Sequence, residues 1–316
     1  MSDLEETVEE ALEYRPEKTW KQKLWTATKT ILKIAVTAVL LYFVFRKVPF
    51  AGVKYRMVHA NFWWMLVALL SFFASMAASS WRLLSFFKSI DLKLDARFNL
   101  RLYLLGLFYN FILPGGIGGD GYKIYLLHKN YDMPGKKVFW AIMFDRLSGL
   151  WAIGVITVAL IFMIPQIDIH MGIPLGILAV GSAVYYFVAH QFFKEYTRFF
   201  FEAHLKAILV QGFQVIAIVC VLLGQDFHGK FSPYLLSFLI SALATIIPIS
   251  VGGAGVRETV FTYLTKWFPM DKSMAVFLPG TFYLLSLIVA LLGIYYVVRP
   301  SRLSDGLPNM QKKIKK

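Results

Sequence analysis

The sequence predicts an all-α polytopic membrane protein with two inverted repeats, each made of three spans and one re-entrant helical hairpin. Of its 316 residues, 58% are hydrophobic and only 16% are charged, a composition that excludes an ordinary soluble domain. Six apolar runs are long enough to cross about 30 Å of hydrocarbon. A glycine-rich decapeptide, residues 114–123, recurs without gaps as residues 248–257, and both copies interrupt apolar stretches.

The first 27 residues are predicted to be a cytosolic acidic and interfacial segment. Seven acidic residues fall within the first 17 positions, whereas a signal peptide opens with basic and then apolar residues. A short surface helix and a solvated tail both fit this composition. The basic and aromatic residues 20–25 suit the membrane interface.

The charge of +14 does not indicate a nucleic-acid partner. The basic residues lie between apolar runs and in the tail 299–316, where they face anionic lipid headgroups. The six histidines have no ligand-like spacing, so neither a metal site nor a cofactor is expected. No G-x-S-x-G, HExxH or P-loop motif is present, so we expect no catalytic residues and no enzyme.

We predict the membrane spans from the long apolar runs. We predict the hairpins from the two places where the repeated motif interrupts an apolar stretch. The predicted spans are 28–46, 62–82, 136–163, 171–193, 205–223 and 273–298. Two shorter runs, 98–113 and 231–247, end at the repeated motif, and each is followed by a second short segment. We therefore predict re-entrant hairpins at 98–130 and 231–267, entering from opposite faces.

Charge bias favours hairpins over complete crossings. If every run crossed the membrane, the lysine-rich region 123–137 would lie outside, against the positive-inside rule. With hairpins, that region, the region 194–206 and both chain termini are cytoplasmic in a multi-pass protein of the cell membrane. The basic residues between 46 and 56 do not fit this orientation.

The order of elements makes residues 28–163 the first repeat and residues 164–298 the second. Because the first starts inside and the second outside, the repeats are inverted. Inverted repeats supply the two related conformations that alternating access requires.

The repeated motif predicts the binding site. A helix broken within a bilayer leaves backbone groups that only protein or a water-filled cavity can satisfy, and paired breaks indicate a transporter site. A helix that starts after each break presents a partly positive N-terminus to a phosphate or carboxylate. Lys123 and Arg257 occupy equivalent first-turn positions. The alternative is that the glycines only allow close helix packing.

Other charged residues also fall within apolar segments. Asp145 and Arg146 are about 13 Å into their span at 1.5 Å per residue, where charges are costly. A network such as Asp145 with Lys123 and a static buried ion pair both remain open. Arg82 is expected to snorkel to the interface, and Asn110 either caps freed backbone or contacts ligand. The predicted substrate-binding residues are Asn110, Pro114, Gly118, Gly119, Asp120, Lys123, Asp145, Arg146, Pro248, Gly252, Gly253, Gly255, Arg257 and Glu258.

Three motifs in this order resemble the lysylphosphatidylglycerol synthase transmembrane (flippase-like) family over about residues 28–298. They are Asn110-x-x-x-Pro114-Gly-Gly-x-Gly-Gly-Asp120-Gly, Asp145-Arg146-x-x-Gly149 and Pro248-x-x-x-Gly252-Gly253-x-Gly255-x-Arg257-Glu258. In bifunctional members this region is joined to a cytosolic aminoacyltransferase domain and is thought to move the aminoacylated lipid outward. The resemblance implies the stand-alone form, without lysyl transfer. Pro279-Gly280 stands at the second-half equivalent of Asp145-Arg146, so that pair is not duplicated.

The leading hypothesis is a translocator of an anionic or aminoacylated phospholipid, or of a polyprenyl-phosphate-linked lipid. Its headgroup would enter between the hairpins, and Arg257→Ala or Asp145→Ala would abolish transport in a folded protein. One alternative is a small-anion transporter whose cavity is closed to lipid. Another is a non-transporting membrane partner of a glycosyl- or aminoacyltransferase, docked through the acidic N-terminal segment and the basic tail.

Overall fold

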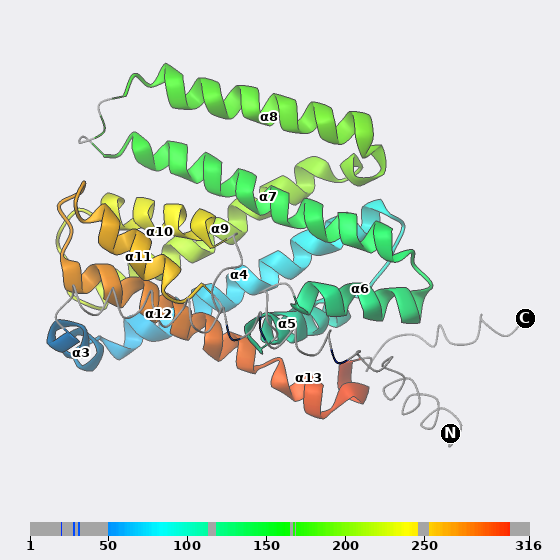
Figure 1. Ribbon diagram of the computed structural model, residues 1–316, viewed down its shortest axis with the longest axis horizontal. Helices are drawn as coiled ribbons and strands as arrows, with labels where there is room; N and C mark the ends of the chain where they lie inside the picture. Colours follow the sequence, from blue (N-terminus) through cyan, green and yellow to red (C-terminus); the bar gives the residue numbers. More distant parts are fainter. Residues whose placement is uncertain are drawn as a thin grey trace, which may run out of the picture.

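The computed structural model describes residues 20, 28, 31, 50–112, 118–164, 167, 169–245 and 253–303, whose regular structure is entirely helical (Figure 1). Most of the predicted span 28–46, nearly all of the segment 1–27, most of the tail, and Pro114, Pro248 and Gly252 lie outside the described residues. The helices are Phe50–Val58 (α3), Phe62–Ser89 (α4), Ala96–Ile112 (α5), Gly118–Tyr131 (α6), Gly135–Ile161 (α7), Gly172–Phe192 (α8), Lys194–Thr197 (η1), Phe200–Leu223 (α9), Ser232–Ala244 (α10), Val256–Leu264 (α11), Lys272–Leu291 (α12), Ile294–Val298 (α13) and Pro300–Leu303 (η2).

Five long apolar segments can cross a membrane: α4, α7, α8, α9 and the stretch from α12 through α13. They confirm five of the predicted spans within the described residues. α4 continues to Ser89, seven residues beyond the predicted end. The extension is stable because Leu83, Phe86 and Phe87 are at most 1% exposed and bury their apolar side chains in the core.

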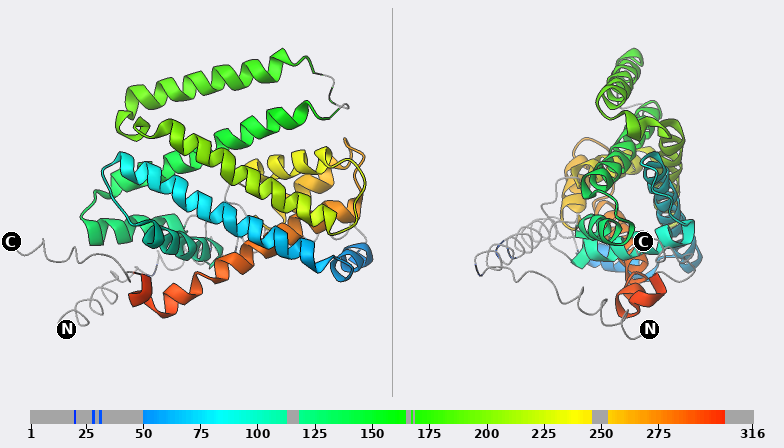
Figure 2. Two further views of the ribbon diagram at one scale, coloured as in Figure 1. Left: turned by 180° about the vertical axis from the view of Figure 1, so that it is seen from behind. Right: turned by 90° about the vertical axis from the view of Figure 1, so that its right-hand side faces the viewer.

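Helices α4, α7 and α9 form the centre of the bundle, where α9 packs along both of the others (Figure 2). One apolar core lies where α10 and α12 meet these helices, and it includes Phe238, Leu239 and Phe282. A second core lies where α4, α5 and α7 meet, and it includes Phe86, Leu105 and Phe144.

Two pairs of shorter helices complete the bundle. α5 packs against α6, and α10 packs against α11; with 17, 14, 13 and 9 residues, all four are shorter than the candidate spans. The end of α6 and the start of α7 lie at one end of the molecule (Figure 1). The end of α11 and the start of α12 lie at the opposite end, where the Asp271 N–H donates to the Tyr234 hydroxyl at 2.8 Å.

α8 lies at the edge of the bundle. It packs against α7 and η1, and only 6% of its apolar span is buried (Figure 1). Trp151 of α7 donates its indole N–H to the Ser182 hydroxyl of α8 at 2.8 Å. Most of the α8 surface is therefore available to surrounding lipid.

Candidate functional site

The start of α6 is held directly against α5. A Cβ atom added to Gly119 would overlap the carbonyl oxygen of Gly106, so the two backbones approach too closely for any larger residue. The Asn110 side-chain oxygen accepts a hydrogen bond from the Gly119 N–H at 2.8 Å. Of the two roles open for Asn110, the structure therefore supports capping of a helix-start N–H group.

Asp120, in the first turn of α6, is shared by two cations. It accepts a hydrogen bond from the Lys123 ammonium at 3.1 Å and one from the Arg146 Nε of α7 at 2.7 Å. The Arg146 Nη2 also contacts this carboxylate. Lys123 is 4% exposed, and its ammonium lies 4.4 Å from the centre of the Tyr103 ring. Two cations and one carboxylate give this group a charge of +1.

Asp145, the residue before Arg146, pairs with Arg82 of α4. The Arg82 Nε and Nη2 donate to the two carboxylate oxygens at 2.7 and 3.0 Å, a bidentate geometry. Both residues are buried. The expectation that Arg82 snorkels to the interface is therefore wrong, and the suggested pairing of Asp145 with Lys123 does not form.

Sequence analysis missed Arg82 as a site residue because the predicted span ended at that position. The sequence feature that could have revealed Arg82 is the largely apolar stretch 83–87 that follows it. Because this stretch continues the helix, Arg82 lies inside the protein and not at the end of a span. Gly149 of α7 provides the space, because a Cβ atom there would lie 3.1 Å from the Arg82 Nη1.

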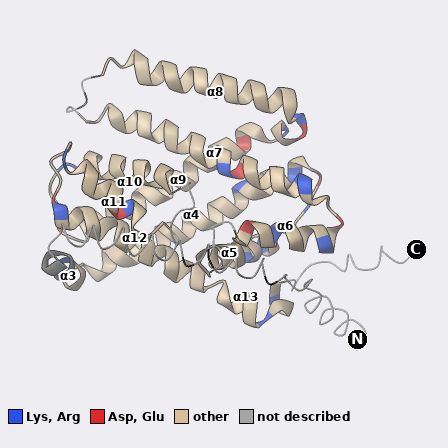
Figure 3. Cartoon of the chain, viewed as in Figure 1, with Lys and Arg blue, Asp and Glu red and all other residues tan. Residues whose placement is uncertain are grey.

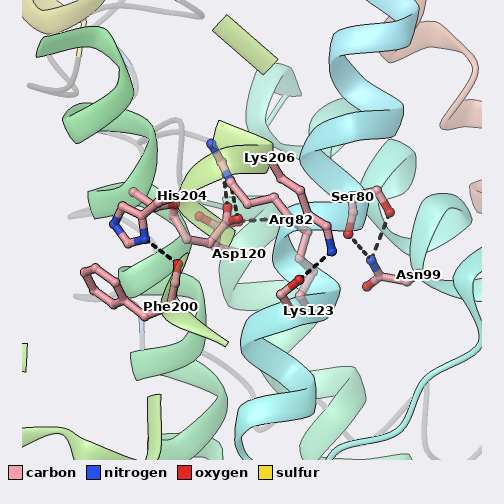
Figure 4. A network of polar contacts seen from close by, with 11 residues as sticks. Ser80, Arg82, Asn99, Asp120, Lys123, Phe200, His204 and Lys206 are labelled. Atoms are coloured by element: carbon pink, nitrogen blue, oxygen red, sulfur yellow. Dashed lines mark hydrogen bonds and ion pairs between the residues drawn. The ribbon is translucent and has the colours of Figure 1, made fainter. Parts of the chain in front are cut away.

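Further polar contacts surround this pair (Figure 4). Lys206 of α9 donates to the Ser85 hydroxyl at 2.8 Å, forms an ion pair with Glu202, and lies 4.1 Å from the centre of the Trp81 ring. Asn99 donates to the Ser80 backbone and hydroxyl oxygens. The contacts of Lys206 with Ser85 and Trp81, and of Asn99 with Ser80, were not predicted, because they join helices that only the tertiary fold brings together.

The second motif forms a different arrangement. Gly253 and Gly255 have φ angles of +83° and +81°, a region that favours glycine. The Gly255 N–H donates to the Glu258 carboxylate at 2.7 Å, so the chain supplies its own anion at the start of α11.

Arg257 differs in its contacts from Lys123, its counterpart in the first motif. Its guanidinium lies 5.1 Å from the centre of the Phe282 ring and 5.9 Å from that of Phe238. Within the described residues its buried Nη1 has no hydrogen-bond partner, and Arg257 forms no ion pair.

The structure thus brings the predicted residues together in two groups, which Figure 3 shows in different parts of the bundle. We call Asn110, Gly118, Gly119, Asp120, Lys123, Arg146 and the Arg82–Asp145 pair the α6 group. We call Gly253, Gly255, Arg257 and Glu258 the α11 group. Within the described residues, no hydrogen bond or ion pair joins the two groups.

A comparison with known protein families finds a match that covers most of the chain. The family described as lysylphosphatidylglycerol synthase TM region matches residues 30–293. The matched region includes both glycine motifs and every charged residue of the two groups. The comparison with curated proteins finds no match.

Proposed function

The chain belongs to the lysylphosphatidylglycerol synthase transmembrane family, and on this premise we propose that it moves a lipid with an anionic headgroup between membrane leaflets. The substrate is a phospholipid, with or without an aminoacyl group, or a polyprenyl-phosphate-linked lipid. One observation carries the proposal. In the α6 group, Lys123 and Arg146 share the single carboxylate of Asp120 among apolar helices.

An uncompensated charge within a membrane protein is costly and marks a functional site. A phosphate supplies the missing negative charge, and guanidinium and ammonium groups both bind phosphate. The Arg146 side chain is 41% exposed, compared with 13% for Asp120. Its Nε and Nη2 contact Asp120, which leaves Nη1 for a ligand.

The paired short helices support the route of transport. We take α5 with α6, and α10 with α11, as hairpins that enter the membrane from opposite faces within inverted repeats. The contacts within each pair and their positions at opposite ends of the molecule support this topology. Arg257, which has no ion-pair partner among the described residues, supplies a second cation for the headgroup when the site opens to the other face.

Charge supports the orientation. The end of the molecule where α6 passes into α7 carries Lys129, Lys136 and Lys137, and η1 and its following residue add Lys194 and Arg198. The positive-inside rule places this end in the cytoplasm.

A dithionite accessibility assay with fluorescent phosphatidylglycerol in phosphatidylcholine vesicles tests the proposal. We expect the protein to equilibrate the labelled lipid between leaflets, and Arg146→Ala to slow this at least tenfold. Arg198→Ala is the matched control, because its side chain is 62% exposed and pairs with Asp91 away from the α6 group. Flipping by Arg146→Ala at the wild-type rate would exclude the α6 group as the site.

The same vesicles separate the alternatives. A small-anion transporter would carry inorganic phosphate across the membrane without moving the labelled lipid. A partner protein would show neither activity until a lipid-modifying transferase is added. Either result would replace the translocator proposal.

A further inference from the structure

One face of α5 carries three residues that all contact α6. Tyr103, Gly106 and Asn110 are spaced i, i+3 and i+7, which places them on the same side of the helix. Asn110 and Gly106 meet the backbone of Gly119 at the start of α6. Gly106 and Tyr103 also meet the side chain of Lys123. This face of α5 therefore holds both the backbone of α6 and its buried cation.

Gly106 and Tyr103 together form a slot for the lysine side chain, which we call the lysine slot. A Cβ atom at Gly106 would lie 2.5 Å from the Lys123 Cε and 3.3 Å from its Nζ, so glycine is needed to leave room for the lysine. The Lys123 Nζ lies 4.4 Å from the centre of the Tyr103 ring, within the range of a cation–π interaction. Because Lys123 is only 4% exposed, this contact is shielded from water, where such interactions are stronger.

The lysine slot leaves part of the ammonium available to a ligand. An ammonium group has three N–H donors. Asp120 accepts a hydrogen bond from one of them at 3.1 Å, and the Tyr103 ring faces the same ammonium. Within the described residues, Lys123 forms no other hydrogen bond. Lys123 and Arg146 bind different oxygens of the Asp120 carboxylate, so an anion beside this carboxylate can meet both cations.

The second motif holds its cation in a comparable way. The Arg257 guanidinium lies 5.9 Å from the centre of the Phe238 ring of α10. A Cβ atom at Gly253 would lie 3.3 Å from the Arg257 Nε. Phe238 precedes Arg257 by 19 residues, and Tyr103 precedes its lysine by 20. In both motifs the cation therefore lies against a glycine and against an aromatic ring of the preceding helix, which indicates that the ring belongs to the cation site.

We propose that Tyr103 and Gly106 are positioning residues of the α6 group, which hold the Lys123 ammonium in place for an anionic headgroup. A lysine side chain that is free to move loses rotamer freedom when it binds a ligand, and this loss lowers affinity. A lysine that the protein already holds in one place avoids that loss. The inference rests on the proposed function, because it takes the α6 group as the headgroup site.

Gly106→Ala tests the lysine slot with little change in stability. The added Cβ atom would meet the end of a flexible lysine side chain, which can move away at low cost. We expect Lys123 to leave the slot, and binding of dihexanoyl phosphatidic acid to the purified protein in detergent to weaken about fivefold. Native mass spectrometry measures this binding. Gly121→Ala is the matched control, because the space around Gly121 is open and the affinity should not change.

Substitutions of Tyr103 test the aromatic contact in the same assay. Tyr103→Leu keeps an apolar side chain but removes the ring, so it should also weaken phosphatidic acid binding about fivefold. Tyr103→Phe keeps the ring face and should bind the lipid as the wild type does. Tyr109→Leu is the matched control on the same helix, because the Tyr109 ring stacks on Tyr122 at 4.8 Å and should leave the affinity unchanged when it is removed.

A Lys123→Met background shows whether both residues act through the lysine. Asp120 keeps Arg146 as its counter-ion in this variant, so no buried charge is left unpaired. We expect Lys123→Met to weaken binding by itself. In this background Tyr103→Leu and Gly106→Ala should have no further effect on affinity, because the group that they position is gone. An undiminished effect of either substitution would show that it acts through the packing of α5, and would overturn the inference.

The proposed function has a separate readout in the same experiment, because it predicts that Arg146→Ala loses phosphatidic acid binding. Loss in Arg146→Ala with wild-type affinity in Gly106→Ala and Tyr103→Leu would overturn the positioning role alone. Tighter binding by Tyr103→Leu would do the same, since it would show that the ring competes with the ligand for the ammonium. No loss in Arg146→Ala would overturn the phosphate assignment and the inference with it.

Discussion

Replacing Asp145 by alanine is expected to destabilise the protein strongly, because it leaves a buried guanidinium without its counter-charge. The Arg82 and Asp145 side chains are 7% and 8% exposed and share two hydrogen bonds of 2.7 and 3.0 Å. Removing one partner of such a buried pair costs about 3–5 kcal/mol. The structure therefore replaces the sequence-based expectation that Asp145→Ala abolishes transport in a folded protein.

A double-mutant cycle distinguishes the effect of losing the ion pair from the effect of losing side-chain packing. Arg82→Met and Asp145→Leu should each lower the free energy of unfolding by about 3–5 kcal/mol. The double variant leaves no unpaired charge. Its loss in free energy of unfolding should therefore be much smaller than the sum of the two single losses, with a coupling energy on the order of 3 kcal/mol. Unfolding in mixed micelles of increasing sodium dodecyl sulfate, followed by circular dichroism, measures all four proteins. Additive effects, or single losses below about 1 kcal/mol, would refute this reasoning.

Three further substitutions test local features with the same unfolding assay. Gly119→Ala should lower the free energy of unfolding by about 2–3 kcal/mol, because its Cβ atom would overlap the Gly106 carbonyl oxygen. Gly121→Ala is the matched control, because the space around Gly121 is open. Asn110→Ala should cost about 1 kcal/mol, because the Gly119 N–H loses its acceptor. Asp271→Ala should cost about 1 kcal/mol at neutral pH, since its carboxylate caps the start of α12.

The Asp271 cap should also depend on pH. Burial would raise the pKa of Asp271, but hydrogen bonds from Ser273, the Met274 N–H and Arg56 outweigh it and hold the pKa below its ordinary value. The carboxylate therefore stabilises the protein above about pH 4, and this contribution is lost as the pH falls through the lower folded-state pKa. Equal stability of wild type and Asp271→Ala at pH 7 would contradict the cap, as would a difference that grows on acidification.

Equal losses for Gly119→Ala and Gly121→Ala would show that the contact with Gly106 does not limit packing. An Asn110→Ala variant as stable as the wild type would show that another group satisfies the Gly119 N–H.

The long helices were predictable because apolar runs of span length have few alternatives in a membrane protein. The pairing of Lys123 with Asp120 follows from their i,i+3 spacing once α6 is placed. The Arg82–Asp145 pair joins residues 63 positions apart and depends on how α4 and α7 are rotated. Sequence does not set this rotation, since lipid and protein interior are similarly apolar and α7 shows no clear polar face.

The α11 group was only partly predictable. The glycines indicated unusual backbone, which the positive φ angles of Gly253 and Gly255 confirm. The motif did not indicate that Glu258 would occupy the start of its own helix. Local competition between a side chain and a ligand for the same N–H groups depends on rotamers that residue spacing does not determine.

The close approach of α5 and α6 at Gly106 and Gly119 restricts how these two helices can move relative to each other. With the Gly106 carbonyl against Gly119, neither helix can slide or roll past the other without a backbone collision. If the proposed translocation changes the leaflet from which Asp120 is reached, we expect α5 and α6 to move together. Such a movement would change the contact of α6 with α7, where the long side chain of Arg146 could follow the Asp120 carboxylate.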